Sequence, residues 1–180
     1  MFTPNDGNRI FGADSGSQTV LEYSRAYWTA TLSYGSSLSL QEERALTSML
    51  GKLRGRFGTI KVPCWTRFRD DDVGSITTLV ANKDSFTMTV SAPSVLSQKI
   101  FSAGDYIAFA GELIEVLDDV VTNADGVGSV TMHRRLRATY SSGTAIEYKE
   151  PYCVMRLTDV YSLNRENIVS GTSLSLMEAF

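Results

Sequence analysis

Hydrophobic and polar positions alternate over short stretches along most of the chain, which is the pattern of half-buried β-strands. In residues 27–34, Trp28 and Leu32 alternate with threonine and serine, so we expect a strand that turns both toward a core. Asp125-Gly126 and Ser142-Gly143 are hairpin-type turns, which favour antiparallel pairing. Further strand-type segments are found later in the chain, at residues 59–62, 76–80, 86–90, 106–117, 152–158 and 173–177.

A single amphipathic helix is predicted at residues 40–54. Ser39 and Glu42 fit a capping box, in which each side chain accepts a hydrogen bond from the other residue's backbone N–H. Acidic residues at the start, basic residues at the end and a stop at Gly55 agree with the helix dipole. One face carries the apolar residues Leu46, Met49, Leu50 and Leu53. Because no second long helix is apparent, we expect this face to lie against a sheet.

These elements predict a fold that is mainly β with one amphipathic helix, arranged as a β-sandwich or a β-barrel. Glycine, asparagine, aspartate and serine dominate the first residues, so we interpret residues 1–18 as an irregular N-terminal arm. Residues 19–83 and 151–180 should together form a ring-forming β domain that contains the helix. Residues 84–150 have two interpretations: an inserted second small β-barrel, or part of one continuous sandwich.

Composition is that of an ordinary globular protein. The 180 residues are 43% hydrophobic and 21% charged, and no stretch approaches the ~18 apolar residues of a membrane span. The net charge of −3 argues against nonspecific binding to nucleic acid, and we expect no specific nucleic-acid binding. The N-terminus lacks the apolar core of a signal peptide, so we expect a soluble protein that is made in the cytoplasm.

The sequence contains no complete catalytic constellation. His133 is the single histidine, so a multi-histidine metal site cannot be built within this chain. The glycine-rich residues 7–12 lack the lysine of a phosphate-binding loop. Cys64 and Cys153 form no C-x-x-C pair, and the sequence leaves open whether they pair with each other. We therefore expect no enzyme activity, cofactor or metal, with convergence of two distant carboxylates as the hydrolase alternative.

Charged residues occur in blocks of opposite sign. A basic cluster follows His133, and another basic region precedes an acidic run that does not have calcium-loop spacing. Blocks of this kind suit a contact between copies of one protein, in which a basic patch meets an acidic loop. The predicted subunit-interface residues are Arg54, Arg56, Asp70, Asp71, Asp72, Arg134, Arg135 and Arg137.

The order of several short motifs provides a further signal. Trp28-Thr29-Ala30-Thr31-Leu32 precedes the predicted helix, and Phe57-Gly58-Thr59 follows it. Ala103-Gly104-Asp105-Tyr106-Ile107, Leu136-Arg137 and Leu174-Ser175-Leu176-Met177-Glu178 come later. In this order the motifs resemble those of small tail-tip proteins of long-tailed, siphovirus-type bacteriophages, a group that includes distal tail proteins. The resemblance covers most of residues 19–180.

The resemblance implies a structural virion protein of the tail tip, made in the host cytoplasm. In that family a β domain with one helix builds a ring, commonly a hexamer, between the tail tube and the baseplate hub. The implied partners are other copies of the chain, the tail tube protein and the hub protein, with the tape measure protein as a further candidate. The family contributes no catalytic residues.

A carbohydrate-binding module that engages host surface glycans is the alternative function. A β-rich domain could present the aromatic faces of Tyr27, Trp28, Tyr34 and Trp65 to sugar rings. Burial of Trp28 in the core is the competing interpretation, so the exposure of these rings decides how much support the alternative keeps.

Overall fold

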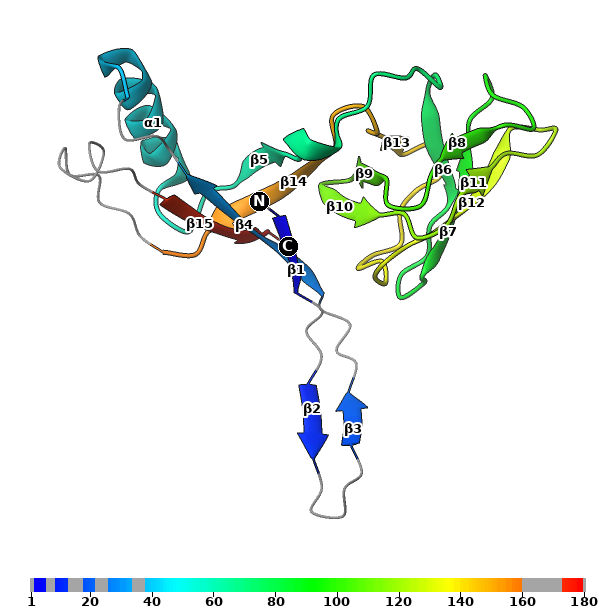
Figure 1. The fold of residues 1–180 in the computed structure, drawn as a ribbon, viewed down its shortest axis with the longest axis horizontal. Coiled ribbons are helices and arrows are strands. Elements are labelled where there is room, and N and C mark those ends of the chain that lie inside the picture. The colour runs from blue at the N-terminus through cyan, green and yellow to red at the C-terminus, as the bar shows by residue number, and fades with distance from the viewer. Residues whose placement is uncertain are drawn as a thin grey trace. The chain divides into compact units, whose positions relative to one another are not determined.

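The computed structural model describes residues 2–5, 9–12, 18–21, 26–33, 38–159 and 173–179. Its described residues form a mainly β structure with one α-helix and several antiparallel sheets, as the sequence predicts (Figure 1). The chain divides into two compact units: unit 1 comprises residues 1–5, 27–62 and 154–180, and unit 2 comprises residues 6–26 and 63–153.

Unit 1 is built on a five-stranded sheet with the order β1-β4-β15-β14-β5. The C-terminal strand pairs with β4 in the register Leu174↔Leu32 and Leu176↔Ala30, so segments from both ends of the chain share one sheet. The backbone N–H of Trp28 donates to Glu178 Oε2 at 3.0 Å across this pairing. The bounds of the strands are β1 (Phe2–Asn5), β4 (Tyr27–Ser33), β5 (Ile60–Pro63), β14 (Tyr152–Leu157) and β15 (Ser173–Glu178).

The helix α1 (Leu40–Leu53) belongs to unit 1 and has the predicted capping box. Ser39 Oγ accepts from the Glu42 backbone N–H at 3.3 Å, and Glu42 Oε2 accepts from the Ser39 backbone N–H at 2.8 Å. Two of the four apolar residues of the predicted face, Leu46 and Leu53, are buried, while Met49 and Leu50 are half-buried. Less of the apolar face of the helix is therefore buried than the sequence suggests.

Unit 2 contains a four-stranded sheet with the order β12-β7-β6-β13, and the two-stranded pairs β10-β9 and β11-β8. Alternation in β7 turns Met88 and Val90 into a core that also contains Phe101, Phe109 and Ile114. The elements are η1 (Trp65–Arg67), β6 (Ile76–Val80), β7 (Thr87–Ser91), β8 (Lys99–Phe101), β9 (Tyr106–Phe109), β10 (Glu112–Glu115), β11 (Val120–Val121), β12 (Val127–Thr131) and β13 (Ala145–Ile146). The sheets among the described residues are open, so the barrel considered for residues 84–150 is not formed.

Two local predictions in unit 2 need correction. Residues 106–117 are a hairpin and not one strand, because Ala110 and Gly111 both have positive φ and turn β9 back into β10. Asp125-Gly126 does lie in a turn, but the strands that flank it do not pair with each other along a ladder. Instead β11 pairs with β8, and β12 pairs with β7. The residues of a turn determine the turn itself, whereas the partner of each flanking strand depends on packing in the whole core.

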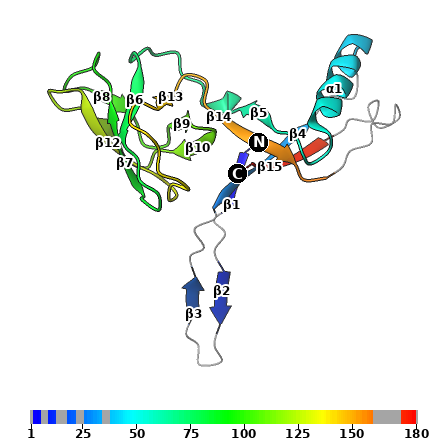
Figure 2. The ribbon, with the colours of Figure 1, turned by 180° about the vertical axis from the view of Figure 1, so that it is seen from behind.

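The described part of the N-terminal segment is also more regular than predicted. β1 is an edge strand that pairs with β4, with Pro4 opposite Trp28, and an edge strand tolerates a proline. β2 (Arg9–Gly12) and β3 (Gln18–Leu21) form an antiparallel pair, visible in both views (Figures 1 and 2). Strand pairing uses backbone groups, so this segment forms strands despite its few apolar side chains.

Candidate functional site

Arg134, a predicted interface residue, lies inside unit 2. Its side chain is 3% exposed and its Nη2 lies 3.1 Å from Glu112 Oε2. The same guanidinium donates to the carbonyl oxygen of Ala26 at 2.9 Å, and Glu112 itself is buried. Arg134 therefore belongs to the interior of this unit and not to an exposed contact surface. Sequence reasoning placed it outside because it treated three neighbouring arginines as one exposed cluster, although Arg134 is buried while Arg135 and Arg137 are half-buried.

The buried ion pair continues into a tyrosine. Tyr140 donates a short hydrogen bond from its hydroxyl to Glu112 Oε1, and its ring makes an edge contact with Phe109. Burial, followed by the hydrogen bond and negative charge of Glu112, raises the pKa of the Tyr140 phenol well above its usual range. The phenol is thus held protonated as a hydrogen-bond donor, which suits a structural network.

The two other arginines of this cluster reach backbone groups and rings of their own unit. Arg137 Nη2 donates to the Ala26 carbonyl oxygen at 2.8 Å. The Arg135 guanidinium lies 4.7 Å from the centre of the Phe86 ring, a cation–π contact. His133 Nδ1 accepts from the Glu115 backbone N–H at 3.0 Å, as a structural histidine would. Both arginines are half-buried, so parts of them remain accessible.

The acidic run at residues 70–72 is largely engaged within unit 2. Arg69 forms two hydrogen bonds to Asp71 and a third to Asp105 at 2.9 Å. Asp72 Oδ1 accepts from Tyr148 and Gly74, and lies 3.3 Å from Lys149 Nζ. These contacts lower the pKa of both carboxyl groups, through Arg69 for Asp71 and chiefly through the Gly74 N–H for Asp72. All three aspartates are exposed. The run therefore pairs with groups of its own loop and still faces solvent.

The remaining predicted residues, Arg54 and Arg56, flank a turn at the end of α1 in unit 1. Arg54 takes the left-handed conformation with φ 47°, and Gly55 follows with φ 68°. Arg56 pairs with Asp159 at 3.1 Å, with both side chains more than 60% exposed. The same turn presents Phe57, which is 85% exposed. Sequence reasoning missed Phe57 as a surface residue, because an apolar residue directly after a helix and its basic turn is equally compatible with burial.

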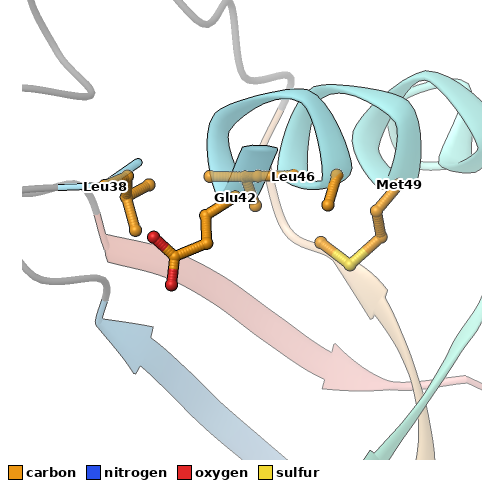
Figure 3. Close-up of a pocket in the computed structure, with 5 residues that line it drawn as sticks. Leu38, Glu42, Leu46 and Met49 are labelled. Carbon is orange, nitrogen blue, oxygen red and sulfur yellow. The ribbon is translucent and has the colours of Figure 1, made fainter. Parts of the chain in front are cut away.

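A groove of about 330 Å³ lies along one side of α1, between Leu38 and Met49. Its floor is mainly apolar, and Figure 3 shows Leu38, Glu42, Leu46 and Met49 on the same side of the helix. Ala45 completes the lining. Hydrogen bonds from the Ser39 side chain and backbone lower the pKa of Glu42, so its carboxylate is charged at neutral pH. The arrangement is an open apolar slot with one fixed negative charge, suited to an apolar group from a partner.

The aromatic residues of the carbohydrate alternative are in different environments. Trp28 is 1% exposed and belongs to the core, as the alternation of its strand predicts. Tyr27 is half-buried and accepts from Asn5 Nδ2 at 3.0 Å, while Tyr34 lies outside the described residues. Trp65, on η1, is 60% exposed. One of the four rings is therefore well presented to solvent.

Cys64 and Cys153 are buried and are not joined in a disulfide. Burial is the main cause that raises the pKa of Cys64, which keeps it in the thiol form. Within the described ranges, no cluster of three or more histidine, cysteine, aspartate or glutamate residues could hold a metal ion. No helix in that part of the chain is long and apolar enough to cross a membrane.

Comparison with known proteins gives no family assignment: no family model matches the chain, and no curated protein matches it. The resemblance to phage tail-tip proteins accordingly stays a prediction from short motifs.

Proposed function

We propose that this protein is a self-associating structural component of a bacteriophage tail tip, which forms a ring that joins the tail tube to the baseplate hub. The tail-tip assignment is supported by the motif resemblance. The observation that carries self-association is the α1 groove, because an amphipathic helix that leaves Met49 half-buried and Ala45 exposed has apolar surface available for a partner.

The proposed role is architectural, with no catalytic residue. Charged groups that could serve chemistry are engaged in contacts that hold the fold: Glu112 binds Arg134 and Tyr140, and Asp71 binds Arg69. On this proposal the partners are further copies of the chain in a hexameric ring, the tail tube protein and the hub protein, with the tape measure protein as an additional contact. The protein acts in the virion after synthesis in the host cytoplasm.

Native mass spectrometry of the full chain over a range of concentrations tests self-association, and electron microscopy of virions labelled with an antibody to the chain tests location. We expect a closed oligomer of defined mass, and label at the tip of the tail. A strictly monomeric protein at high concentration contradicts the ring, and label elsewhere on the particle contradicts the tail-tip assignment.

Carbohydrate binding is kept as a second candidate because Trp65 is 60% exposed and Phe68, three residues later in the sequence, is 40% exposed. Exposed aromatic rings of this kind can stack on the apolar face of a sugar. Binding to a glycan array that Trp65→Ala abolishes, and that the matched aromatic truncation Phe57→Ala leaves intact, supports this function. The absence of binding to every glycan on the array contradicts carbohydrate binding.

A further inference from the structure

Phe57 is held outward by a turn of fixed geometry. Two successive left-handed residues, Arg54 and Gly55, reverse the chain after α1. The Gly58 backbone N–H then donates to the Leu53 carbonyl oxygen at 2.7 Å and closes the turn. The closed turn fixes the backbone that carries this 85% exposed phenyl ring, so the ordering cost on entry into a pocket is confined largely to the side chain. Preorganised aromatic side chains are the usual anchors of protein interfaces.

The α1 groove has the size and chemistry to receive such a ring. An engineered protein cavity of about 150 Å³ lined by apolar side chains binds benzene. The groove, with about 330 Å³ open on one side, has room for a phenyl ring and part of its backbone. Leu46 and Met49 offer aliphatic and thioether contacts, of which the sulfur also favours aromatic rings.

The charges around the ring and the groove are of opposite sign. Lys52, Arg54 and Arg56 precede Phe57 in sequence and are exposed, with Arg56 partly neutralised by Asp159. Glu42 lines the groove as a carboxylate. A cationic turn that approaches this acidic slot is therefore attracted to it, which identifies the occupant as a partner with a basic turn around an aromatic anchor. This chain carries such a turn itself.

Phe57 does not fill the groove of its own molecule. Its ring is 85% exposed, and the groove is lined by residues between Leu38 and Met49, whereas Phe57 lies in the turn that follows Leu53 at the end of the helix. Anchor and groove thus form the two different halves of a head-to-tail contact, which produces a ring when its rotation closes.

We propose that Phe57 of one copy inserts into the α1 groove of the next copy, with Arg54 and Arg56 near Glu42 of that groove. This inference rests on the proposed self-association and names the contact that produces it. It replaces the predicted contact between the arginines after His133 and the acidic run at residues 70–72.

Three variants of the full chain test the contact by native mass spectrometry. Phe57→Ala removes the anchor, and Ala45→Trp fills the groove from an exposed helix position. Trp65→Ala is the matched truncation of an exposed aromatic residue in unit 2. We expect the first two to raise the concentration for half-assembly at least about tenfold, and the third to leave it unchanged. Circular dichroism should show that all three remain folded, because the altered side chains are exposed.

Mixing the two deficient variants gives the decisive result. Phe57→Ala retains an intact groove and Ala45→Trp retains an intact anchor, so a head-to-tail contact predicts a one-to-one dimer that cannot grow further. Normal assembly of Phe57→Ala overturns the inferred contact, and so does a mixture of the two variants that stays monomeric. If the wild type still assembles in that case, the proposed function is not contradicted. A monomeric wild type contradicts both.

Discussion

At the scale of single residues, Arg134 and Glu112 place two opposite charges inside unit 2. Their side chains are 3% and 7% exposed, and Arg134 Nη2 lies 3.1 Å from Glu112 Oε2. Taking both charges out of water is costly, and their attraction offsets that cost only while both partners are present. The pair also ties Ala26 to the rest of this unit, because the same guanidinium donates to the Ala26 carbonyl oxygen.

Removing one partner should therefore be strongly destabilising. Arg134→Met leaves the Glu112 carboxylate buried without its cation, and we expect a loss of about 3–5 kcal/mol in the free energy of unfolding, measured with urea. Adding Glu112→Gln to this variant should recover part of the loss, because the buried charge is gone. Arg135→Met is the control: it removes a contact with the Phe86 ring near the surface and should cost about 1 kcal/mol or less. Equal losses for Arg134→Met and Arg135→Met contradict the buried pair.

Tyr140 should make stability fall in alkaline solution. Its pKa is raised above the usual 10.0 by burial and by Glu112, so the folded protein retains a proton that the unfolded chain releases. This contribution is fully present below pH 10 and is lost as the pH rises beyond it, because the unfolded state binds fewer protons there. Burial also raises the pKa of Tyr106 and Tyr148, so ultraviolet absorbance should show Tyr140 among the tyrosines that ionise late, and Tyr140→Phe should reduce the late step that accompanies unfolding by one tyrosine. Ionisation of all tyrosines without unfolding is the contrary outcome.

At the scale of elements, the end of α1 contains two glycines with opposite surroundings. A Cβ added to Gly51 meets no atom within 4 Å, whereas one added to Gly58 would lie 2.6 Å from the Leu53 carbonyl oxygen. Gly51 is inside the helix, and Gly58 lies where the turn returns against the last helical residue. The same substitution should therefore have opposite effects at the two positions.

We expect Gly51→Ala to stabilise the protein by about 0.5–1 kcal/mol, because alanine is the better helix former. Gly58→Ala should destabilise it by about 1–3 kcal/mol, because the backbone of the turn must shift. Thermal unfolding measured by circular dichroism distinguishes the two. Stabilisation by both substitutions would show that the turn around Phe57 is loose, and would weaken its role as a presented anchor.

The elements that sequence predicted best are those whose signals are local. The capping box at Ser39 fixed the start of α1, and alternation predicted β4 with Trp28 inside. Partner strands were not predictable, because the turn at Asp125-Gly126 is compatible with several pairings and the core of unit 2 selects among them. The exposure of Phe57 could not be calculated from sequence either, since an apolar residue after a helix is as compatible with burial as with display.

At the scale of the whole molecule, the charge blocks in the sequence differ in how freely they face solvent: Arg54, Arg56 and the acidic run at residues 70–72 are exposed, whereas Arg134 is not. Arg134 is an interior residue, and Asp71 and Asp72 bind groups of their own unit. Sequence gives the order of charges along the chain, but burial and local pairing decide which of them a partner can meet. The groove of α1 is the converse case. The apolar face of α1 was predicted from sequence. How much of that face is buried depends on where α1 is placed in the tertiary structure.

The larger segment of unit 2, residues 63–153, is inserted into the chain of unit 1 between two neighbouring strands. The chain leaves unit 1 at the end of β5 and returns near the start of β14, and these strands are adjacent in the sheet. The Cys64 backbone N–H donates to the Pro151 carbonyl oxygen at 2.8 Å, so the two ends of residues 63–153 lie together. All residues of the hydrophobic core of unit 2 lie between Ile76 and Tyr148. A segment with adjacent ends and its own core meets the requirements for independent folding.

We therefore expect a fragment of residues 63–153 to fold alone and to unfold cooperatively, with dispersed amide resonances in its NMR spectrum. It should be less stable than unit 2 in the full chain, because Arg134 and Arg137 lose the Ala26 carbonyl oxygen as an acceptor. The control is the same fragment with Val90→Asp, which places a charge at a position of 0% exposure and should prevent folding. If the unsubstituted fragment gives the same poorly dispersed amide resonances as this control, the core of unit 2 depends on unit 1 or on residues 6–26. The insertion is then not an independent domain.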